Sequence, residues 1–282
     1  MEKHISAWTE RGEKPCNQDF VALQTKTYRE THQFSMQVEG DDLLAVVCDG
    51  ISQGSQGEVA AALVAQTLCE RFAQESAMTT DALLAQLDAC NDAVVHYYHS
   101  DAFPCPQMGG TTLAALYITQ DNCATVCNIG DSGIYILRDG QFCALYQEHT
   151  LAGEQQRQGQ PYDPTVSNML TQFLGNPYQV GSEQAYTTVL DLLPGDKLLL
   201  CSDGVSKTLP EDQLIHILTT QPADKVAKVL VDTAVGTAHD NVTALVITIG
   251  KKTTTTKRLG LVHILLRCLR RKPKDIEKRS HL

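Results

Sequence analysis

The order of secondary-structure patterns along the chain predicts the α+β class, in which sheets pack under helices. Eight short apolar runs have the length of strands, four segments have helical periodicity, and the two kinds occur in blocks rather than in alternation. The chain has 282 residues, of which 43% are hydrophobic and 20% charged. This composition can build a large core and excludes a disordered or collagen-like chain.

The predicted strands are apolar runs, many of them rich in Val, Ile, Thr and Tyr, which are typical strand residues. A further strand is expected to begin at Asp19. Between two of the runs lies Arg138-Asp139-Gly140-Gln141, and an Asp-Gly pair at such a place favours a tight hairpin. The eight runs cover residues 43–48, 112–118, 123–129, 134–137, 142–145, 186–192, 197–201 and 242–249.

The predicted helices come in two pairs. Apolar residues three and four positions apart predict helices over residues 58–72 and 81–98, with Thr80 as the expected N-cap of the second. Two shorter helices are expected over residues 210–218 and 222–235, because each begins with a proline in its first turn.

Charge divides the chain into two parts. The net charge is −10, but residues 251–282 carry +9 and residues 1–250 carry −19. We therefore predict an acidic catalytic domain over residues 1–250 and a separate basic tail over residues 251–282. Within the domain, residues 150–185 are polar and contain Gly and Pro, so an irregular, flap-like surface excursion is expected there. The acidic balance argues against nucleic acid as a partner.

The tail contains a candidate basic amphipathic helix. Leu259, Val262, Leu266 and Leu269 are three or four positions apart, with arginines beside them. The apolar run of about eleven residues is shorter than the ~20 needed to cross a bilayer. Three interpretations stay open: peripheral contact with an anionic membrane, docking on a protein partner, or folding back on the acidic domain. Liposome flotation of the full chain against a chain ending at Gly250 tests the first.

The ten cysteines predict a reducing compartment. They occur singly, mostly inside apolar runs, with no CxxC pair and no Cys/His ligand spacing. Buried reduced thiols are the expected state. The first residues contain no apolar signal segment, so we predict a cytoplasmic location, with a membrane-peripheral one left open by the tail.

The most informative pattern is an aspartate at the end of several predicted strands. Such a residue is anchored by the sheet and projects at its rim, where several like charges would repel one another unless a cation balanced them. Carboxylate oxygens suit Mg²⁺ or Mn²⁺ rather than Zn²⁺, and a following glycine lets the backbone approach an ion. A single Asp-Gly is most often a simple turn, but five sites in one chain favour a metal centre. They are Asp19, Asp49 with Gly50, Asp131, Asp203 with Gly204, and Asp240.

These motifs resemble those of the metal-dependent serine/threonine protein phosphatases of the type-2C (PPM) family, most closely bacterial members. The resemblance spans about residues 5–250 and implies a four-layer αββα sandwich of two mainly antiparallel sheets flanked by helix pairs. Its motifs, in family order, are Asn17-Gln18-Asp19, the stretch VVCDGISQGSQGEVAA from Val46, Gly109-Gly110-Thr111-Thr112, IGDSGIYILRDG from Ile129, LLLCSDGV from Leu198, and Asp240-Asn241-Val242-Thr243.

The resemblance also implies a ligand set for two Mn²⁺ or Mg²⁺ ions. Asp49 would bridge both ions, and Gly50 would offer its carbonyl. Asp203 and Asp240 would hold one ion through their side chains. Thr111 and Thr112 would support the site without performing chemistry.

Two further aspartates have implied roles at the rim. Asp19 would act from outside the ligand set or through metal-bound water. Asp131, together with Asp203, would hold a third, weaker ion. With Asp49 as the bridging ligand, the predicted catalytic residues are Asp19, Asp49 and Lys14.

The chain departs from the family pattern at several positions, including Ile51, Ser52 and Gln53, which stand where the family has Met-Gly-Gly. Gln18 stands where the family often has Glu, and Gly133 stands where an Arg closes the motif around Asp131. Lys14 occupies the slot of the phosphate-binding Arg, with Arg11 three residues earlier, so either side chain is a candidate for phosphate. A lysine attracts phosphate as a point charge but lacks the two-point contact of Arg.

The implied activity is hydrolysis of phosphoserine and phosphothreonine in proteins by a metal-activated water, with no covalent intermediate. The expected partner is a phosphoprotein made by a serine/threonine kinase, and the chain is expected to be a monomer. His149 is a candidate proton donor to the leaving alkoxide. The alternative interpretation is that His149 faces solvent or caps a local turn. Arg157 is either a phosphopeptide contact or a solvated side chain.

The alternative function is a non-catalytic module of the same fold that binds a phosphoprotein or a regulatory partner. Lys14, Gln18 and Gly133 motivate it. The joint presence of Asp49, Asp203 and Asp240 favours the enzyme. Another kind of metal-dependent hydrolase is disfavoured, because the chain lacks the His-rich ligand sets that such sites often use.

Overall fold

The computed structural model describes residues 1–29, 34–51, 56–74, 79–100, 109–179 and 181–250. Met1–Lys251 form one compact unit. The basic tail and its candidate amphipathic helix lie outside the described residues, and the predicted boundary after residue 250 stays a prediction. Among the described helices, none has the length and apolar character that crossing a bilayer requires.

One sheet has six strands in the order β4-β1-β12-β11-β8-β9, and all neighbours are antiparallel. In its interior the first strand pairs with the last, from Lys3 opposite Ile249 to Glu10 opposite Val242. The strands are β1 (Glu2–Glu10), β4 (Phe34–Glu39), β8 (Gly133–Arg138), β9 (Gln141–Ala144), β11 (Lys197–Cys201) and β12 (Val242–Ile249).

The second sheet also has six antiparallel strands, in the order β10-β7-β6-β5-β2-β3. Its register places Asp19, the first residue of β2, opposite Asp49, the last residue of β5. The strands are β2 (Asp19–Leu23), β3 (Lys26–Tyr28), β5 (Leu43–Asp49), β6 (Leu113–Ile118), β7 (Cys123–Ile129) and β10 (Tyr186–Asp191).

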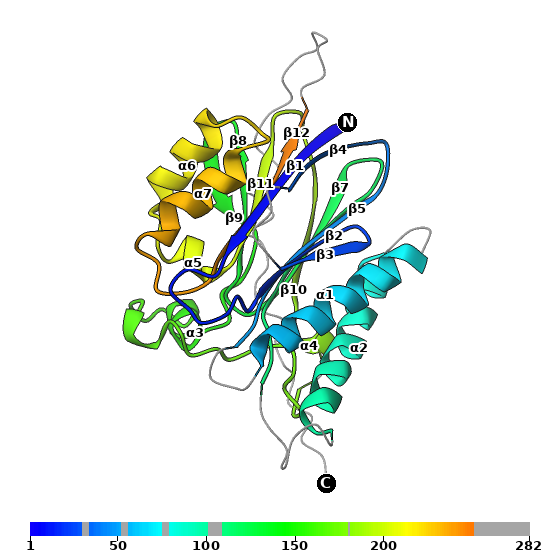
Figure 1. The fold of residues 1–282 in the computed structure, drawn as a ribbon, viewed down its shortest axis with the longest axis vertical. Coiled ribbons are helices and arrows are strands. Elements are labelled where there is room, and N and C mark those ends of the chain that lie inside the picture. The colour runs from blue at the N-terminus through cyan, green and yellow to red at the C-terminus, as the bar shows by residue number, and fades with distance from the viewer. Residues whose placement is uncertain (30–33, 52–55, 75–78, 101–108, 180, 251–282) are drawn as a thin grey trace. The chain divides into compact units, whose positions relative to one another are not determined.

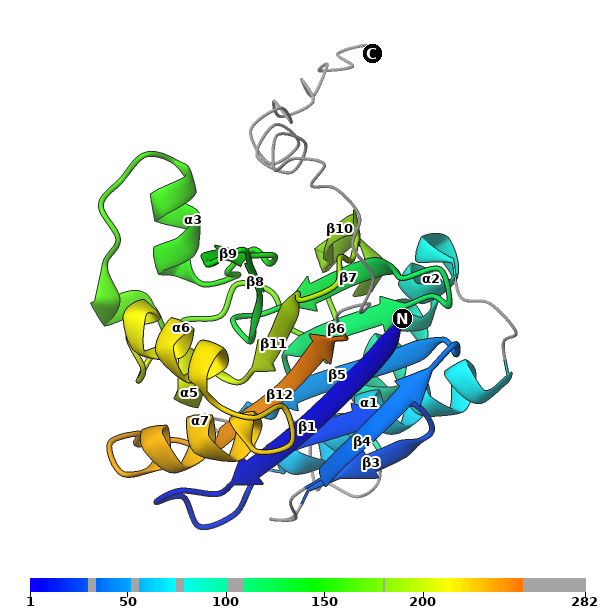
Figure 2. The same ribbon diagram turned by 90° about the horizontal axis from the view of Figure 1, so that it is seen from above.

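Helices cover the outer face of each sheet, so the layers follow the order helix, sheet, sheet, helix (Figures 1 and 2). This arrangement confirms the predicted four-layer fold with flanking helix pairs. On the second sheet lie α1 (Gly57–Gln74) and α2 (Thr80–Tyr98), and the short α4 (Gly181–Gln184), near the end of the excursion, packs against α2. On the first lie α5 (Asp203–Ser206), α6 (Glu211–Thr220) and α7 (Val226–Val235). The excursion contains α3 (Leu151–Arg157) and the 3-10 turn η1 (Pro164–Val166).

The double layer of sheets explains why the central strands are apolar throughout. In β5, Leu44 and Val46 pack against the helix layer of α1 and α2. Their neighbours Leu43, Ala45 and Val47 pack between the two sheets. A strand buried on both faces needs apolar residues at every position, which is the pattern that predicted it.

The predicted hairpin is present between β8 and β9. Asp139 and Gly140 have φ of 51° and 81°. Two successive positive φ angles are the requirement of the tight turn that matches the twist of the strands, and Asp-Gly meets it at low cost.

Some boundaries differ from the predicted ones. The N-cap of α2 is Thr79, not Thr80, because the Thr79 hydroxyl accepts a hydrogen bond of 3.1 Å from the Ala82 amide. Helix α7 begins at Val226 rather than at residue 222, after a turn closed by the Val226 amide on the Pro222 carbonyl. Helix α3 also gives the excursion a regular element that its composition did not predict.

Candidate metal centre

Five aspartates gather where strands of both sheets end. Asp19 and Asp49 are paired in the second sheet. From the first sheet, Asp203 follows β11 as the first residue of α5, and Asp240 lies two residues before β12. Asp131 lies in the tight connection from β7 to β8, between the two sheets. Four of them, all except the fully buried Asp19, line one pocket.

The pocket has a volume of about 730 Å³, with an acidic floor and an apolar wall. Gly50, Lys14 and Asn168 also line it. The wall consists of Ile51, Met169, Leu170 and Phe173, three of which belong to the excursion. The excursion therefore forms one side of the pocket.

Asp19 carries a buried carboxylate atom that lacks a partner. Its Oδ2 accepts hydrogen bonds from the hydroxyls of Ser202 at 2.7 Å and Thr243 at 2.6 Å. Its Oδ1 is buried and has no hydrogen-bond partner among the described residues. Burial raises the pKa of Asp19 to about 7, the two hydroxyls oppose the rise, and the charges of Asp203 and Asp240 add to it.

Two threonines fix the backbone of Asp49. The Thr111 hydroxyl donates to the Asp49 carbonyl at 2.9 Å, and the Thr112 hydroxyl accepts the Asp49 amide at 3.1 Å. This matches the supporting role expected for the pair. Burial, together with the charges of Asp19 and Asp203, raises the pKa of Asp49 well above its usual value.

The glycine after Asp49 is required by packing within the chain. A Cβ on Gly50 would lie 2.3 Å from the carbonyl oxygen of Gly57, at the start of α1. A Cβ on Gly204 would lie 2.0 Å from the carbonyl oxygen of Asn241. Both glycines were expected to let the backbone approach an ion. In the structure, each glycine instead lies close to a neighbouring segment of backbone.

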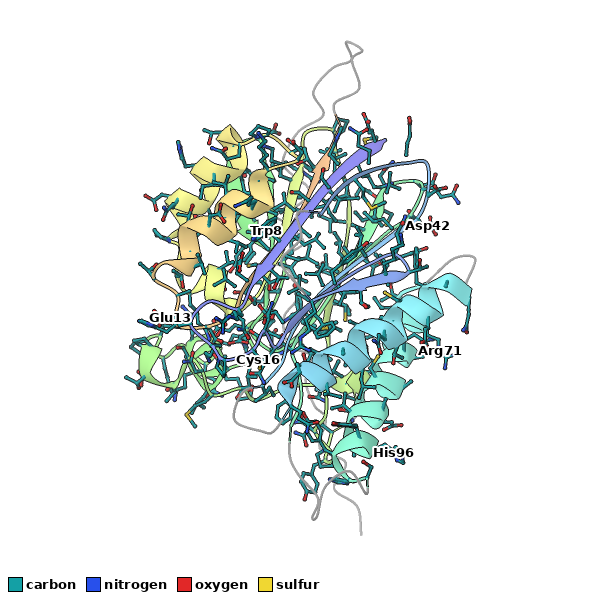
Figure 3. All side chains as sticks on the ribbon, in the orientation of Figure 1. Trp8, Glu13, Cys16, Asp42, Arg71 and His96 are labelled. Atoms are coloured by element: carbon teal, nitrogen blue, oxygen red, sulfur yellow. The ribbon has the colours of Figure 1, made fainter. Side chains whose placement is uncertain are left out.

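Asn241 holds the loop that brings Lys14 to the pocket. Its Oδ1 accepts the Gln18 amide at 2.9 Å, and its Nδ2 donates to the carbonyls of Arg11 at 2.8 Å and Cys16 at 3.0 Å. Figure 3 labels Glu13 and Cys16 on this loop, beyond the end of β1. Sequence reasoning missed Asn241, although it lies inside the last motif that carried the resemblance.

The two candidate phosphate contacts take different places. Lys14 lines the pocket, and its Nζ lies 3.0 Å from Oδ1 of Asp240. Arg11 is exposed, and its Nη1 donates to the Lys14 carbonyl at 3.0 Å. Lys14 is therefore the one of the two that faces the acidic floor.

A second lysine, Lys207, lies among the aspartates. Its Nζ is 2.6 Å from Oδ2 of Asp131 and 2.9 Å from Oδ2 of Asp203. Burial raises the pKa of Asp131 to about 6, Asp203 adds to the rise, and Lys207 opposes it. Burial lowers the pKa of Lys207, but the charges of Asp131 and Asp203 outweigh that effect and leave it raised.

His149 is buried, so the interpretation of His149 as a solvent-facing side chain is wrong. Only 2% of its surface is exposed, and its Nδ1 accepts the Gly130 amide at 3.2 Å. The His149 amide donates to the Gly130 carbonyl at 3.0 Å. Burial, assisted by the charge of Arg157, lowers the pKa of His149 to about 4. A neutral imidazole thus fixes the turn that carries Asp131, and His149 is not among the residues that line the pocket.

Two other predicted positions lie outside the acidic floor. Arg157 is exposed, and its Nη1 donates to the Glu148 carbonyl at 2.7 Å. At Gly133, a Cβ would lie 2.5 Å from the ring of Tyr135, which leaves no room for the arginine of the family motif.

The donor set fits divalent cations by charge and chemistry. Within the described residues, no three His, Cys, Asp or Glu side chains converge closely enough to hold one ion as they stand. Five carboxyl groups nevertheless gather beside two ammonium groups, and the charges of neighbouring aspartates help to raise the pKa values of Asp19, Asp49 and Asp131. Hard oxygen donors, one of them an orphaned buried atom, are what Mg²⁺ or Mn²⁺ would satisfy.

Residues 16–238 match the family model described as Protein phosphatase 2C. The chain belongs to the protein phosphatase 2C family. This confirms the resemblance and the predicted enzyme class, a serine/threonine protein phosphatase. The match extends over most of the chain and includes four of the five aspartates of the centre.

Two relatives of this phosphatase illustrate the similarity. The serine/threonine phosphatase stp of Listeria welshimeri is 26% identical over 216 residues, which cover 72% of this chain and 83% of that protein. The serine/threonine protein phosphatase PstP of Mycobacterium tuberculosis is 29% identical over 209 residues, which cover 72% of this chain and 40% of that longer protein.

Solved structures have the same fold as this phosphatase. The catalytic domain of PstP in complex with two manganese ions aligns with a TM-score of 0.70 and 26% identity, over 89% of this chain and 100% of that chain. The PPM phosphatase MsPP of Mycobacterium smegmatis, in complex with cacodylate, aligns with a TM-score of 0.70 and 28% identity, over 87% and 98%.

Proposed function

We propose that this phosphatase hydrolyses phosphoserine and phosphothreonine in proteins with two Mn²⁺ or Mg²⁺ ions at the acidic floor of the pocket. The observation that carries the proposal is the gathering of five aspartates from both sheets, with a buried carboxylate atom left without a partner. The two manganese ions in the PstP structure support it.

Asp49, the Gly50 carbonyl, Asp203 and Asp240 would hold the two ions. When bound, such a pair supplies a nucleophile from water at neutral pH and stabilises charge on the phosphoryl oxygens. The chain's own contribution is positioning, since Thr111 and Thr112 fix the backbone of Asp49. Asp19 is proposed to act from outside the ligand set, where its buried Oδ1 has no hydrogen-bond partner among the described residues.

Lys14 is the proposed phosphate contact. It faces the pocket, and its ammonium pairs with Asp240, so it can turn toward a phosphate when an ion neutralises that carboxylate. The apolar wall beside it suits a side chain adjacent to the phosphorylated residue.

The substrate is proposed to be a phosphoprotein made by a serine/threonine kinase and met in the cytoplasm by a monomeric enzyme. The eight cysteines in the described part of the chain are all free, and five are buried, which supports a reducing setting.

The test uses a phosphothreonine peptide and the full chain. Turnover is expected with Mn²⁺, is lost with chelator, and falls about 100-fold or more in Asp203→Asn. Asp232→Asn, a carboxylate on the exposed face of α7, is the matched control and keeps wild-type turnover. Peptide binding without turnover under all metal conditions would instead identify the non-catalytic module.

A further inference from the structure

Lys207 is surrounded by four oxygen atoms from three segments of the chain. Its Nζ lies 2.6 Å from Asp131 Oδ2 and 2.9 Å from Asp203 Oδ2. It also donates to Asn168 Oδ1 at 2.9 Å and to the Ser167 carbonyl at 3.1 Å. An ammonium group has three hydrogens to donate, so these four acceptors use its full capacity.

The local backbone places Lys207 there. Asp203 is the first residue of α5, and Lys207 is the residue that ends it, four positions later. Residues four apart lie on one face of a helix, so the lysine stem returns over its own Asp203. Asp131 reaches the same point from the other sheet. The lysine side chain is 30% exposed, while those of Asp131 and Asp203 are 6% and 18% exposed.

This is the place that the family resemblance assigns to a third, weaker ion, held by Asp131 and Asp203. A divalent ion bound through the Oδ2 atoms of both carboxylates would have to displace Lys207 from them. It would also meet the repulsion of a fixed positive charge. The residues at this point therefore fit a monovalent ammonium and not a further metal ion.

We propose that Lys207 is a built-in cation that replaces the third ion and positions the excursion against the acidic floor. This proposal rests on the proposed two-ion function. Ser167 and Asn168 precede Met169 and Leu170, which form part of the pocket wall. Lys207 thus joins that wall to Asp131 and Asp203. It is a positioning residue, since it acts through the segments it holds.

The first experiment counts bound ions. Calorimetric titration with Mn²⁺ is expected to show two ions on the wild-type chain and an additional weak ion on Lys207→Met, which keeps the stem and removes the charge. Lys228→Met is the control, because Lys228 also pairs with an aspartate four positions away, Asp232, but on α7. Three ions on the wild type, or the same count in Lys207→Met, would overturn the replacement of the third ion.

The second experiment measures the local stability of the segment that Lys207 holds, and it does not depend on enzyme turnover. Amide hydrogen exchange at residues 166–171 is expected to become about tenfold faster in Lys207→Met and to stay unchanged in Lys228→Met. The Thr171 amide, bonded to the His149 carbonyl, is a suitable probe. Unchanged exchange in Lys207→Met would overturn the positioning role.

Kinetics separate this proposal from the proposed function. If Lys207 holds the wall, Lys207→Met raises KM for a phosphopeptide several-fold, and KM for para-nitrophenyl phosphate, which lacks the flanking residues of a peptide, changes less. An equal loss of kcat on both substrates, with no change in KM, would contradict it. If the wild-type chain binds no Mn²⁺ and turns over neither substrate, the proposed function fails, while the exchange experiment still decides whether Lys207 holds the segment.

Discussion

Ser202, which follows β11, donates a hydrogen bond of 2.7 Å to Oδ2 of Asp19, the first residue of β2. The strands β11 and β2 beside them belong to different sheets. Thr243 on β12 donates to the same oxygen at 2.6 Å. The position of Asp19 beneath the pocket is therefore set by strands that come more than 180 residues later in the chain.

Removal of the Ser202 hydroxyl is expected to weaken metal binding in a pH-dependent way. The hydrogen bond favours the charged carboxylate, so Ser202→Ala raises the pKa of Asp19 further above about 7. Mn²⁺ affinity, measured by calorimetry, is expected to fall about tenfold at pH 7 and to recover at pH 8.5. Thr237→Ala, which removes an exposed hydroxyl, is the control. An equal loss at both pH values would mean that the hydroxyl does not act through the proton of Asp19.

Gly50→Ala is expected to destabilise the fold by about 3 kcal/mol or more. Its Cβ would lie 2.3 Å from the Gly57 carbonyl oxygen, and backbone on both sides leaves little room for adjustment. Gly236→Ala is the matched control, because nothing lies within 4 Å of its added Cβ and its φ is −71°. Urea unfolding measures both variants. Equal stability of the two would show that the start of α1 can move away from the rim.

His149 is expected to make the fold less stable in acid. Its pKa is about 4 when folded against an ordinary value near 6.5, so below pH 6.5 the unfolded chain binds a proton that the folded chain does not. The contribution of His149 to the free energy of unfolding is fully present above pH 6.5 and is lost as the pH falls toward 4. Between pH 8 and pH 5 the loss is about 2 kcal/mol.

The measurement compares the wild type with His149→Asn, whose amide oxygen can accept the Gly130 amide without titrating. Urea unfolding at pH 8 and pH 5 is expected to show the smaller loss in the variant. The difference between the two proteins isolates His149 from the carboxylates, which titrate in both. The same loss in both proteins would assign the acid sensitivity to other groups.

Arg138 and Asp196 form a buried ion pair whose disruption is expected to cost about 3–5 kcal/mol. The Arg138 Nε donates to Asp196 Oδ1 at 2.7 Å, and the two side chains are 10% and 1% exposed. Arg138→Ala leaves a buried carboxylate without its cation. Lys228→Ala, which breaks the exposed pair with Asp232, is expected to cost less than about 1 kcal/mol in the same urea titration. Similar costs for the two variants would refute the distinction.

The sequence predicted the apolar strands and the strand-end aspartates because both signals are local. The run at 123–129 coincides with β7, since a strand buried on both faces is apolar at every position. Asp49 and Asp203 stand out because each ends an apolar run and precedes a glycine. The layer order and the ligand roles came from the family resemblance, and the ligand roles stay predictions.

The strand β1 escaped prediction because its polar residues have distant partners. Lys3, Ser6 and Thr9 are all buried in this central strand, against the usual pattern. The Thr9 hydroxyl lies 2.7 Å from that of Thr243, and Lys3 donates to the Asp41 carbonyl at 3.2 Å. A local window of sequence cannot contain such pairs. The contacts of Asn241, and those of Lys207 with Asp131, Ser167 and Asn168, were missed for the same reason.

The pairing of β1 with β12 has a consequence for synthesis on the ribosome. The first strand stays without its central neighbour until residues 242–249 have been translated and have left the exit tunnel. The carboxylate of Asp19 likewise lacks one of its hydrogen-bond donors until Thr243 has been translated. A nascent chain that stops short of β12 can therefore form neither the middle of its first sheet nor the floor of its pocket.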